Sequence, residues 1–397
     1  MAKIHPHFKK KSKKAVLITS LAAGILLSGC QLQTNQKNPP QSELNELTIS
    51  VDSGLVTDDF LNFVEEFSVE QGIPFKIIDR PSGDAGENEV RTELLSGNSA
   101  DILLFNSGGL FKSLDPKEYF YDLSKEDYTA QYIDSYKKSV SVGNEVYGLP
   151  IGNADAIGFI YSKELYQEMD LAIPANWADF MANLKRLKEE QVTPILTPFK
   201  DQWLTQYYWY AAELTTPDSG MKGYQKALEK IDLLNSNHFF SENLLTMSFS
   251  EGLDKLGRKT SAHLLGQYSF KKYLVTNHIL DDQDVGFFPY PNEQNQYVYM
   301  LPSSLYINKR TRNLSICQKF FESYFSKNIN KQTSSIEQPG ILESAKIKPD
   351  KIIYEQQMNY KVDNLSELLL DYFTHTLTAE EVITQFQQRN DELKKIY

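Results

Sequence analysis

The stretch LTISVDSGLVTDDFLNFVEEFSVEQGIPFKII, residues 47–78, decides the fold. Its first five residues, Leu47–Val51, alternate apolar and hydroxyl side chains and predict a strand. A helix is expected over residues 58–70, because apolar residues recur there at helical spacing: Phe60, Leu61, Val64 and Phe67. Residues 73–78 predict a second strand. Strand, helix and strand in this order are typical of an α/β sheet.

The same alternation continues along the chain. A short helix is expected over residues 89–96, ending at Gly97. The continuous apolar run Ile102–Phe105 predicts a parallel strand covered on both faces. Further elements are expected as strands at 156–161 and 285–288, a helix at 174–190, and helices over the last 35 residues. We therefore expect an open, mostly parallel α/β sheet, and two lobes, since a body of about 350 residues exceeds one core.

The N-terminus carries a targeting signal. Six lysines lie before residue 15, and the apolar run Ala15–Leu27 follows them. That run is too short to span a hydrocarbon core, which needs about 20 residues, but it suits a secretory signal. It ends in Leu27-Ser28-Gly29-Cys30, which resembles the bacterial lipobox. The resemblance implies a lipoprotein signal peptide over residues 1–29 and a lipid on Cys30, whose two or more acyl chains would anchor the protein stably. The alternatives are an ordinary cleavable signal peptide, or an apolar helix with a chance cysteine.

Composition limits the partners. Residues 30–46 are rich in Gln, Asn, Ser and Pro, so we expect a flexible tether there.

The net charge is −11, and removal of the six N-terminal lysines would leave −17. Such an acidic chain is not expected to bind nucleic acid, which requires basic patches. Cys317 lies in a helical apolar pattern and is expected to be a buried, inert thiol.

Several segments, in chain order, resemble motifs of the extracellular solute-binding proteins of the maltose-binding type. They are Ala100–Ile102, Gly143–Pro150, Phe159–Leu165, Pro174–Phe180, Thr260–Tyr268, Val285–Pro291 and Ser304–Asn308. Two positions depart from the family pattern: Ser162 replaces the usual Asn, and Tyr268 replaces Trp in a segment one residue shorter. The likeness covers most of residues 47–397.

This resemblance implies two α/β lobes with a ligand cleft between them. Lobe one would comprise residues 47–150 plus 303–327, and lobe two residues 151–302 plus 328–397. The implied function is capture of a small solute, with a mono- or oligosaccharide expected, for an ABC importer permease driven by an ATPase. The protein is expected to be an extracytoplasmic monomer held at the membrane through the Cys30 lipid. The alternatives are a sensor or adhesin of the same fold, and import of a non-sugar such as a cationic amine.

The candidate ligand contacts lie just past strands, since ligands of open α/β folds bind at the carboxyl ends of the strands. Aromatic faces stack on the C–H faces of a sugar, while carboxylates and amides bond its hydroxyls. The candidates are Asp52, Phe105, Asn106, Asp155, Trp203, Tyr207 and Tyr268. By resemblance, Asp155 falls where the maltose-binding protein has a sugar-binding carboxylate, and Tyr268 falls on the stacking Trp.

Structural roles are the alternative at each of these positions. Asp52 could cap a turn, Phe105 could be core, and Asn106 could form a turn. The aromatic residues from Trp203 to Tyr210 could be a packed helix face, and Trp177 is expected in the core at a helix start.

No enzyme, cofactor or metal site is expected. The sequence lacks the short signatures of serine hydrolases, zinc peptidases and nucleotide-binding loops. A glycosidase remains as an alternative, with Asp155 and Asp201 facing each other across the cleft. The histidines are scattered, which argues against a metal triad, and the pattern around His263 predicts a helix.

Overall fold

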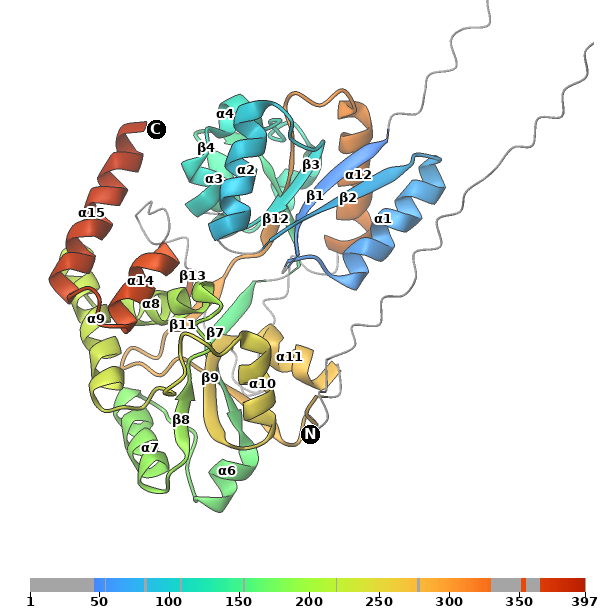
Figure 1. Cartoon of the computed structure of the whole chain (residues 1–397). Helices are drawn as coiled ribbons and strands as arrows, with labels where there is room; N and C mark the ends of the chain where they lie inside the picture. The colour runs from blue at the N-terminus through green and yellow to red at the C-terminus, as the bar shows by residue number, and fades with distance from the viewer. Residues whose placement is uncertain are drawn as a thin grey trace, which may run out of the picture. The chain divides into compact units, whose positions relative to one another are not determined.

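The computed structural model describes residues 46–329, 351–354 and 365–396, apart from residues 54, 82–83, 108, 153, 219 and 277–278. The predicted signal peptide, Cys30 and most of the tether lie outside the described residues, as does His278. The residues that are described belong to one compact unit, Leu44–Tyr397 (Figure 1). Among them, no helix has the length and apolar character needed to cross a membrane.

The first sheet has the strand order β2-β1-β3-β12-β6. Strand β1 runs parallel to β2 and β3, whereas β12 runs antiparallel to β3 and β6. Their bounds are β1 Leu47–Asp52, β2 Phe75–Arg80, β3 Ile102–Phe105, β6 Gly148–Ile151 and β12 Ser303–Ile307. The accompanying helices are α1 Asp58–Gln71, α2 Asp84–Ser96, α3 Gly109–Ser113, α4 Pro116–Tyr119, α5 Asp134–Ser139 and α12 Leu314–Tyr324. Smaller elements are a 3₁₀ turn Asp127–Gln131, the hairpin β4 Ser141–Val142 with β5 Glu145–Val146, and a π-helical turn Phe325–Ile329.

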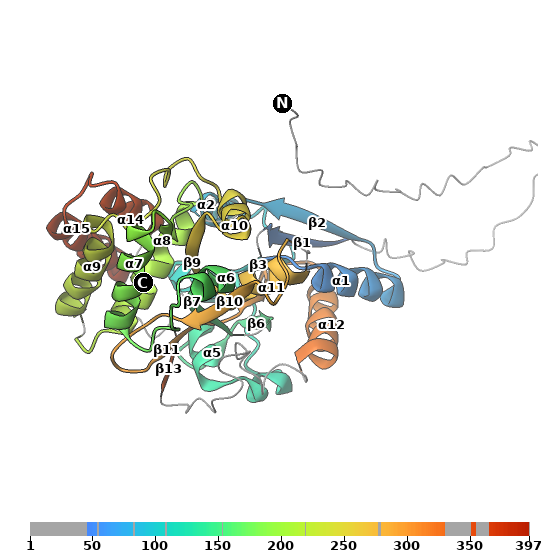
Figure 2. The ribbon, with the colours of Figure 1, turned by 90° about the horizontal axis from the view of Figure 1, so that it is seen from below.

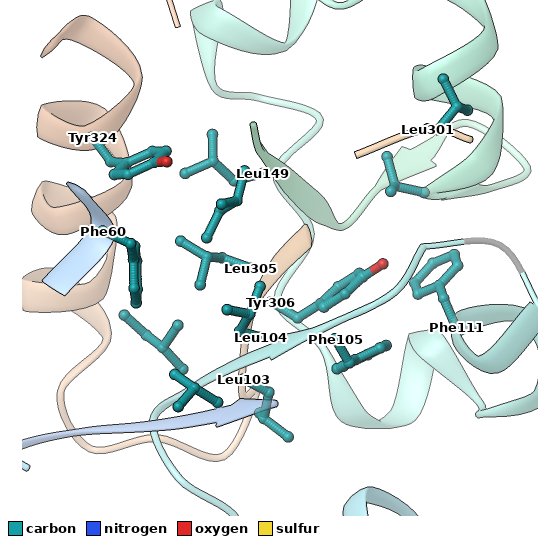
Figure 3. Packing of buried hydrophobic residues seen from close by; sticks show 14 of the residues in the cluster. Phe60, Leu103, Leu104, Phe105, Phe111, Leu149, Leu301, Leu305, Tyr306 and Tyr324 are labelled. Atoms are coloured by element: carbon teal, nitrogen blue, oxygen red, sulfur yellow. The ribbon is translucent and has the colours of Figure 1, made fainter. Parts of the chain in front are cut away.

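Helix α1 shows how the sequence sets these elements. The Thr57 side chain accepts a hydrogen bond from the Phe60 amide at 3.2 Å and starts the helix. Gly72, at φ +65°, ends it in a left-handed conformation that suits glycine. Between them, Phe63 packs edge-to-face on Tyr324 of α12 at 5.0 Å, so the two helices lie side by side (Figures 1 and 2). Phe60, Tyr324 and the sheet residues Leu103–Phe105 belong to one apolar core (Figure 3).

The second sheet has the order β13-β11-β7-β9-β8, with β10 also paired to β7. The strands are β7 Asp155–Ser162, β8 Thr193–Leu196, β9 Ser261–Gln267, β10 Val285–Pro289, β11 Tyr297–Met300 and β13 Ile352–Tyr354. The helices are α6 Lys163–Glu168, α7 Trp177–Glu189, α8 Thr205–Leu214, α9 Gly220–Ser236, α10 Phe249–Gly257, α11 Tyr268–Thr276, α14 Leu365–Phe373 and α15 Ala379–Ile396, with a 3₁₀ turn at Gln202–Leu204. Helices α9, α14 and α15 gather at one end of this part (Figures 1 and 2).

Within the described residues, the chain crosses twice between the sheets. Strand β6 continues into β7, and β11 continues into β12. The crossings run side by side, because Ile151 is the partner of Ser303 on one side and Asp155 the partner of Met300 on the other. Only residues 152–154 and 301–302 lie between the paired strands. Such short paired connections suit a hinge, in which a few residues absorb a rotation.

The α/β class is confirmed, but two predictions were wrong. The sheets are mixed rather than mostly parallel, because β12 runs antiparallel in the first sheet and β7 is antiparallel to β9, β10 and β11 in the second. His263 lies in β9, not in a helix. That strand is flanked by β7 and β8 and buried along most of its length, so its sequence lacks the alternation of a half-exposed strand.

Candidate functional site

Three predicted contacts lie at the carboxyl edge of the first sheet. Asp52 ends β1 and Phe105 ends β3, and the register pairs Val51 with Leu104, so the two ends are neighbours. Asn106 follows directly, and its side-chain oxygen accepts a hydrogen bond from the Ser303 hydroxyl at 2.9 Å. The loop after β3 is therefore tied to the second crossing.

The Phe105 ring belongs to the core. It is 2% exposed and stacks on Tyr306 at 4.2 Å between ring centroids (Figure 3). In this structure the ring packs in the core beneath the surface at the end of β3. Direct contact of Phe105 with a ligand stays a prediction.

Arg80 is a residue of this edge that the sequence reasoning missed. It ends β2, is 2% exposed, and donates from Nε to the Ser50 hydroxyl at 2.7 Å. Burial lowers the pKa of Arg80, while the carboxylates of Glu93, Asp52 and Glu89 oppose that shift. A signal was present in the sequence. Arg80 follows the second predicted strand as Asp52 follows the first, so the two residues could have been expected at neighbouring strand ends.

Asp155 and Tyr268 come together at the start of α11. Asp155 begins β7, is 9% exposed, and accepts a hydrogen bond from the Ser269 amide at 3.1 Å. Ser269 is the second residue of α11, and Tyr268 is the first. A carboxylate at the positive end of a helix is stabilised there. The same bond therefore ties the carboxylate to the residue that follows the half-buried Tyr268.

The Tyr268 ring has one apolar and two cationic neighbours. Phe287 meets it edge-to-face at 5.3 Å. The Nζ atoms of Lys271 and Lys272 lie 5.7 and 5.8 Å from the ring centroid. These ammonium groups already use the attraction of the ring for cations, and they would repel a cationic ligand.

Trp203 and Tyr207 join the same helix end through Phe270. Their rings meet edge-to-face at 5.8 Å, and each also contacts Phe270, at 6.0 and 6.1 Å. Phe249, the first residue of α10, completes the cluster at 4.7 Å from Phe270. Tyr207 is 6% exposed, whereas the other three rings are half-buried. Sequence reasoning missed Phe249 and Phe270, although Phe270 is only two residues past Tyr268.

A glycine makes room for this cluster. A Cβ atom on Gly266 would lie 2.4 Å from the Phe270 ring, closer than real atoms approach. Gly266 sits one residue before the end of β9, so the strand can pass directly beneath the ring. The four predicted contacts of the second sheet thus converge on the first turn of α11.

Other residues considered in the sequence have structural roles. One carboxylate oxygen of Asp201 accepts a hydrogen bond from the Phe249 amide at 2.6 Å and so holds the start of α10. Trp177 packs on Phe180 at 5.8 Å, against the second core, as predicted. Cys317 is buried as predicted, and burial raises its pKa to about 12.

His263 is held neutral in the core. Its Nδ1–H donates to the Pro194 carbonyl at 2.7 Å, and Nε2 accepts from the Tyr166 hydroxyl at 2.7 Å. Burial lowers its pKa to about 4. Within the described part of the chain, no group of three or more His, Cys, Asp or Glu side chains is placed to hold a metal ion.

Comparison with known proteins decides the family. The model of the bacterial extracellular solute-binding proteins matches residues 53–328, more than half of the chain. The chain belongs to this family. The match spans strands of both sheets and both crossings, together with six of the seven predicted contacts; Asp52 lies one residue before it.

Relatives of this solute-binding protein are similar over most of their length. The multiple sugar-binding protein of Streptococcus mutans is 21% identical over 319 residues, which are 75% of this chain and 74% of the relative. A sugar transporter of Bacillus licheniformis, solved with stachyose, superposes with a TM-score of 0.69 at 17% identity, covering 87% of this chain and all of the other. A protein from work on xylan utilisation by Caldanaerobius polysaccharolyticus superposes with a TM-score of 0.71 at 16% sequence identity. The superposition covers 87% of this chain and 99% of the other. This solute-binding protein has their two-lobed α/β fold.

Proposed function

We propose that the chain is a lipid-anchored, extracytoplasmic receptor that captures a mono- or oligosaccharide and delivers it to the permease of an ABC importer. The observation that carries this proposal is the Asp155–Ser269 bond, which ties a carboxylate to the first turn of the helix that Tyr268 begins. A sugar needs both groups, a flat apolar surface for its C–H face and a charged acceptor for its hydroxyls. The name of the Streptococcus mutans relative and the stachyose in the Bacillus licheniformis structure support the same ligand class.

Lobe one would comprise residues 47–150 plus 303–327, and lobe two residues 151–302 plus 328–397. Lobe one would contribute Asp52 and Asn106, and lobe two Asp155, Tyr268 and Trp203. The second crossing supports the closeness of these groups. Asn106 bonds Ser303, Asp155 pairs with Met300, and three residues span at most about 11 Å. Phe105 and Tyr207, whose rings are buried, would support Asn106 and Trp203.

The mechanism is closure about the two crossings. A sugar that contacts both lobes binds the closed arrangement more tightly than the open one and shifts the population toward it. The closed form would dock on the permease, and the ATPase would supply the energy. No catalytic step is assigned to the chain, which we expect to act as a monomer anchored through Cys30.

A cationic amine is a weaker candidate ligand than a sugar. Lys271 and Lys272 place two positive charges within 6 Å of the Tyr268 ring. A second cation on that ring would meet their repulsion, while a neutral sugar would not. The lysines therefore already occupy the surroundings of the ring, although Asp282, 2.6 Å from Lys271, offsets part of their charge.

The test is thermal unfolding of the mature chain with panels of oligosaccharides, amino acids and polyamines. A ligand at 100 times its dissociation constant stabilises the folded state by about 2.7 kcal/mol and raises the melting temperature. We expect members of the sugar panel to do so. A shift with polyamines or amino acids and none with sugars would overturn the sugar assignment.

A further inference from the structure

Arg80 stands at the point where three segments of the first sheet end. It is the last residue of β2, and its partner in the parallel register is Asp52, the last residue of β1. Ser50 lies two residues before Asp52 and therefore on the same face of the strand. The Arg80 side chain reaches this face.

The guanidinium makes three hydrogen bonds, each to a different segment. Nε donates to the Ser50 hydroxyl of β1 at 2.7 Å, and Nη2 donates to the Leu104 carbonyl of β3 at 2.6 Å. Nη1 donates to the Gly86 carbonyl in α2 at 3.4 Å. Arg80 thereby joins β1, β3 and the start of α2 at the edge that bears Asp52 and Asn106.

The local backbone is built to receive this side chain. A Cβ atom on Gly86 would lie 1.8 Å from the Pro81 carbonyl oxygen, so this close approach is possible only with glycine at that position. The first turn of α2 thus lies near the end of β2, with the Gly86 carbonyl within reach of Arg80. The three hydrogen bonds of Arg80, called the clamp below, therefore depend on the backbone at Gly86 as well as on the arginine.

Several charged groups accompany the buried Arg80 guanidinium. A buried guanidinium is costly unless carboxylates accompany it, and apolar residues of the same volume often serve stability as well. The carboxylate of Glu93 has the largest opposing effect on the pKa of Arg80, followed by that of Asp52. The three hydrogen bonds of the buried guanidinium fix the geometry of the segments that they join.

We propose that Arg80 is the positioning residue of the lobe-one half of the sugar site. It stands beside Asp52 as its register partner and holds the Leu104–Asn106 backbone by hydrogen bonding, so that both meet the ligand in one arrangement. The inference rests on the proposed function, because it assigns Asp52 and Asn106 to ligand contact.

The test compares stachyose affinity by titration calorimetry at 15 °C for the wild-type chain, Arg80→Met, Arg80→Lys, Asp52→Asn and the double variant Asp52→Asn/Arg80→Met. We expect Arg80→Met and Asp52→Asn each to weaken binding by about tenfold, the scale of one charge-assisted hydrogen bond. The double variant should be no weaker than about tenfold, because both changes disable the same contact. Arg80→Lys should recover part of the loss, since it keeps the charge but not the planar fork.

Lys76→Met is the matched control. Lys76 is an exposed residue of the same strand, so this change removes one positive charge from β2 without touching the clamp. Its affinity should equal that of the wild type. If Arg80→Met does not fold, Arg80→Lys and its combination with Asp52→Asn carry the comparison.

The outcomes separate the two proposals. A wild-type chain that binds neither stachyose nor any other member of the oligosaccharide panel would overturn the proposed function together with this role; if another panel sugar binds in place of stachyose, the same comparison is made with that sugar. Wild-type binding that Asp52→Asn weakens but the Arg80 variants leave unchanged would overturn the role of Arg80 alone. A double variant whose loss of affinity equals the sum of the two single losses, in free energy, would also overturn it. Such additivity would mean that Arg80 and Asp52 act independently on the ligand.

Discussion

Replacing Asp155 by asparagine removes a negative charge at the start of β7 and leaves the shape of the side chain nearly unchanged. The amide oxygen of asparagine can still accept the Ser269 N–H bond, now at 3.1 Å. The fold should therefore lose only the attraction between the carboxylate and the first turn of α11, about 0.3–1 kcal/mol. A ligand that bonds this group should lose more.

The expected loss of affinity follows from the chemistry of the acceptor. A hydrogen bond to a charged group contributes about 1.5–3 kcal/mol, and one to a neutral group about 0.5–1.5 kcal/mol. Asp155 is 9% exposed, so solvent competes little for its oxygens. The difference of about 1–2 kcal/mol corresponds to roughly 5- to 30-fold weaker sugar binding.

Titration calorimetry at pH 7 measures this loss, with Asp179→Asn as the control. Asp179 also accepts a backbone N–H bond at a helix start, from Ala175 at 3.2 Å, but it belongs to α7 and not to the site. It should show a similar small loss of stability and no change in affinity. Equal affinity of Asp155→Asn and wild type would refute the assignment of Asp155 to the ligand.

Three further experiments test the neighbouring structure. Tyr268→Ala should weaken sugar binding by roughly two- to tenfold with little change in melting temperature, whereas Trp177→Ala should lower stability by about 3 kcal/mol and leave affinity intact. Thermal unfolding and titration calorimetry of both variants measure this, and a loss of affinity in Trp177→Ala but not in Tyr268→Ala would contradict it. Because burial lowers the pKa of His263 to about 4, the unfolded chain binds the proton first, and the contribution of His263 to stability should fall by about 3 kcal/mol as pH drops from about 6.5 to about 4. Burial raises the pKa of Glu213 to about 7 and acts in the opposite direction, so denaturant unfolding should show the loss as a difference between the wild type and His263→Gln, and equal pH profiles would contradict it. Gly266→Ala should displace the Phe270 ring and cost about 1–3 kcal/mol, and an unchanged melting temperature would contradict the close packing there.

The sequence was most informative where a pattern depends on neighbouring residues. The helix at Asp58–Gln71 and the strand at Ile102–Phe105 follow from local periodicity and were predicted nearly to their bounds. The helix expected over residues 174–190 begins only at Trp177, because the Asn176 side chain accepts the Asp179 amide and caps it there. Local signals of this kind fix elements to within a few residues.

Contacts between distant segments were beyond the same reasoning. The bond from Ser269 to Asp155 joins residues 114 positions apart, and the bond from Arg80 to Leu104 depends on strand order. Sequence analysis could identify Asp155 and Tyr268 as candidates through the family resemblance. It could not show that the Ser269 amide ties Asp155 to the start of α11, nor that Phe270 connects Trp203 to the same helix.

The most direct test is a crystal structure of the mature chain grown with the sugar that gives the largest thermal shift. The account predicts one sugar with a ring face on Tyr268, a hydroxyl on the Asp155 carboxylate, and further contacts to Asp52 or Asn106 from the other lobe. A sugar bound elsewhere, or one that contacts a single lobe, would contradict it.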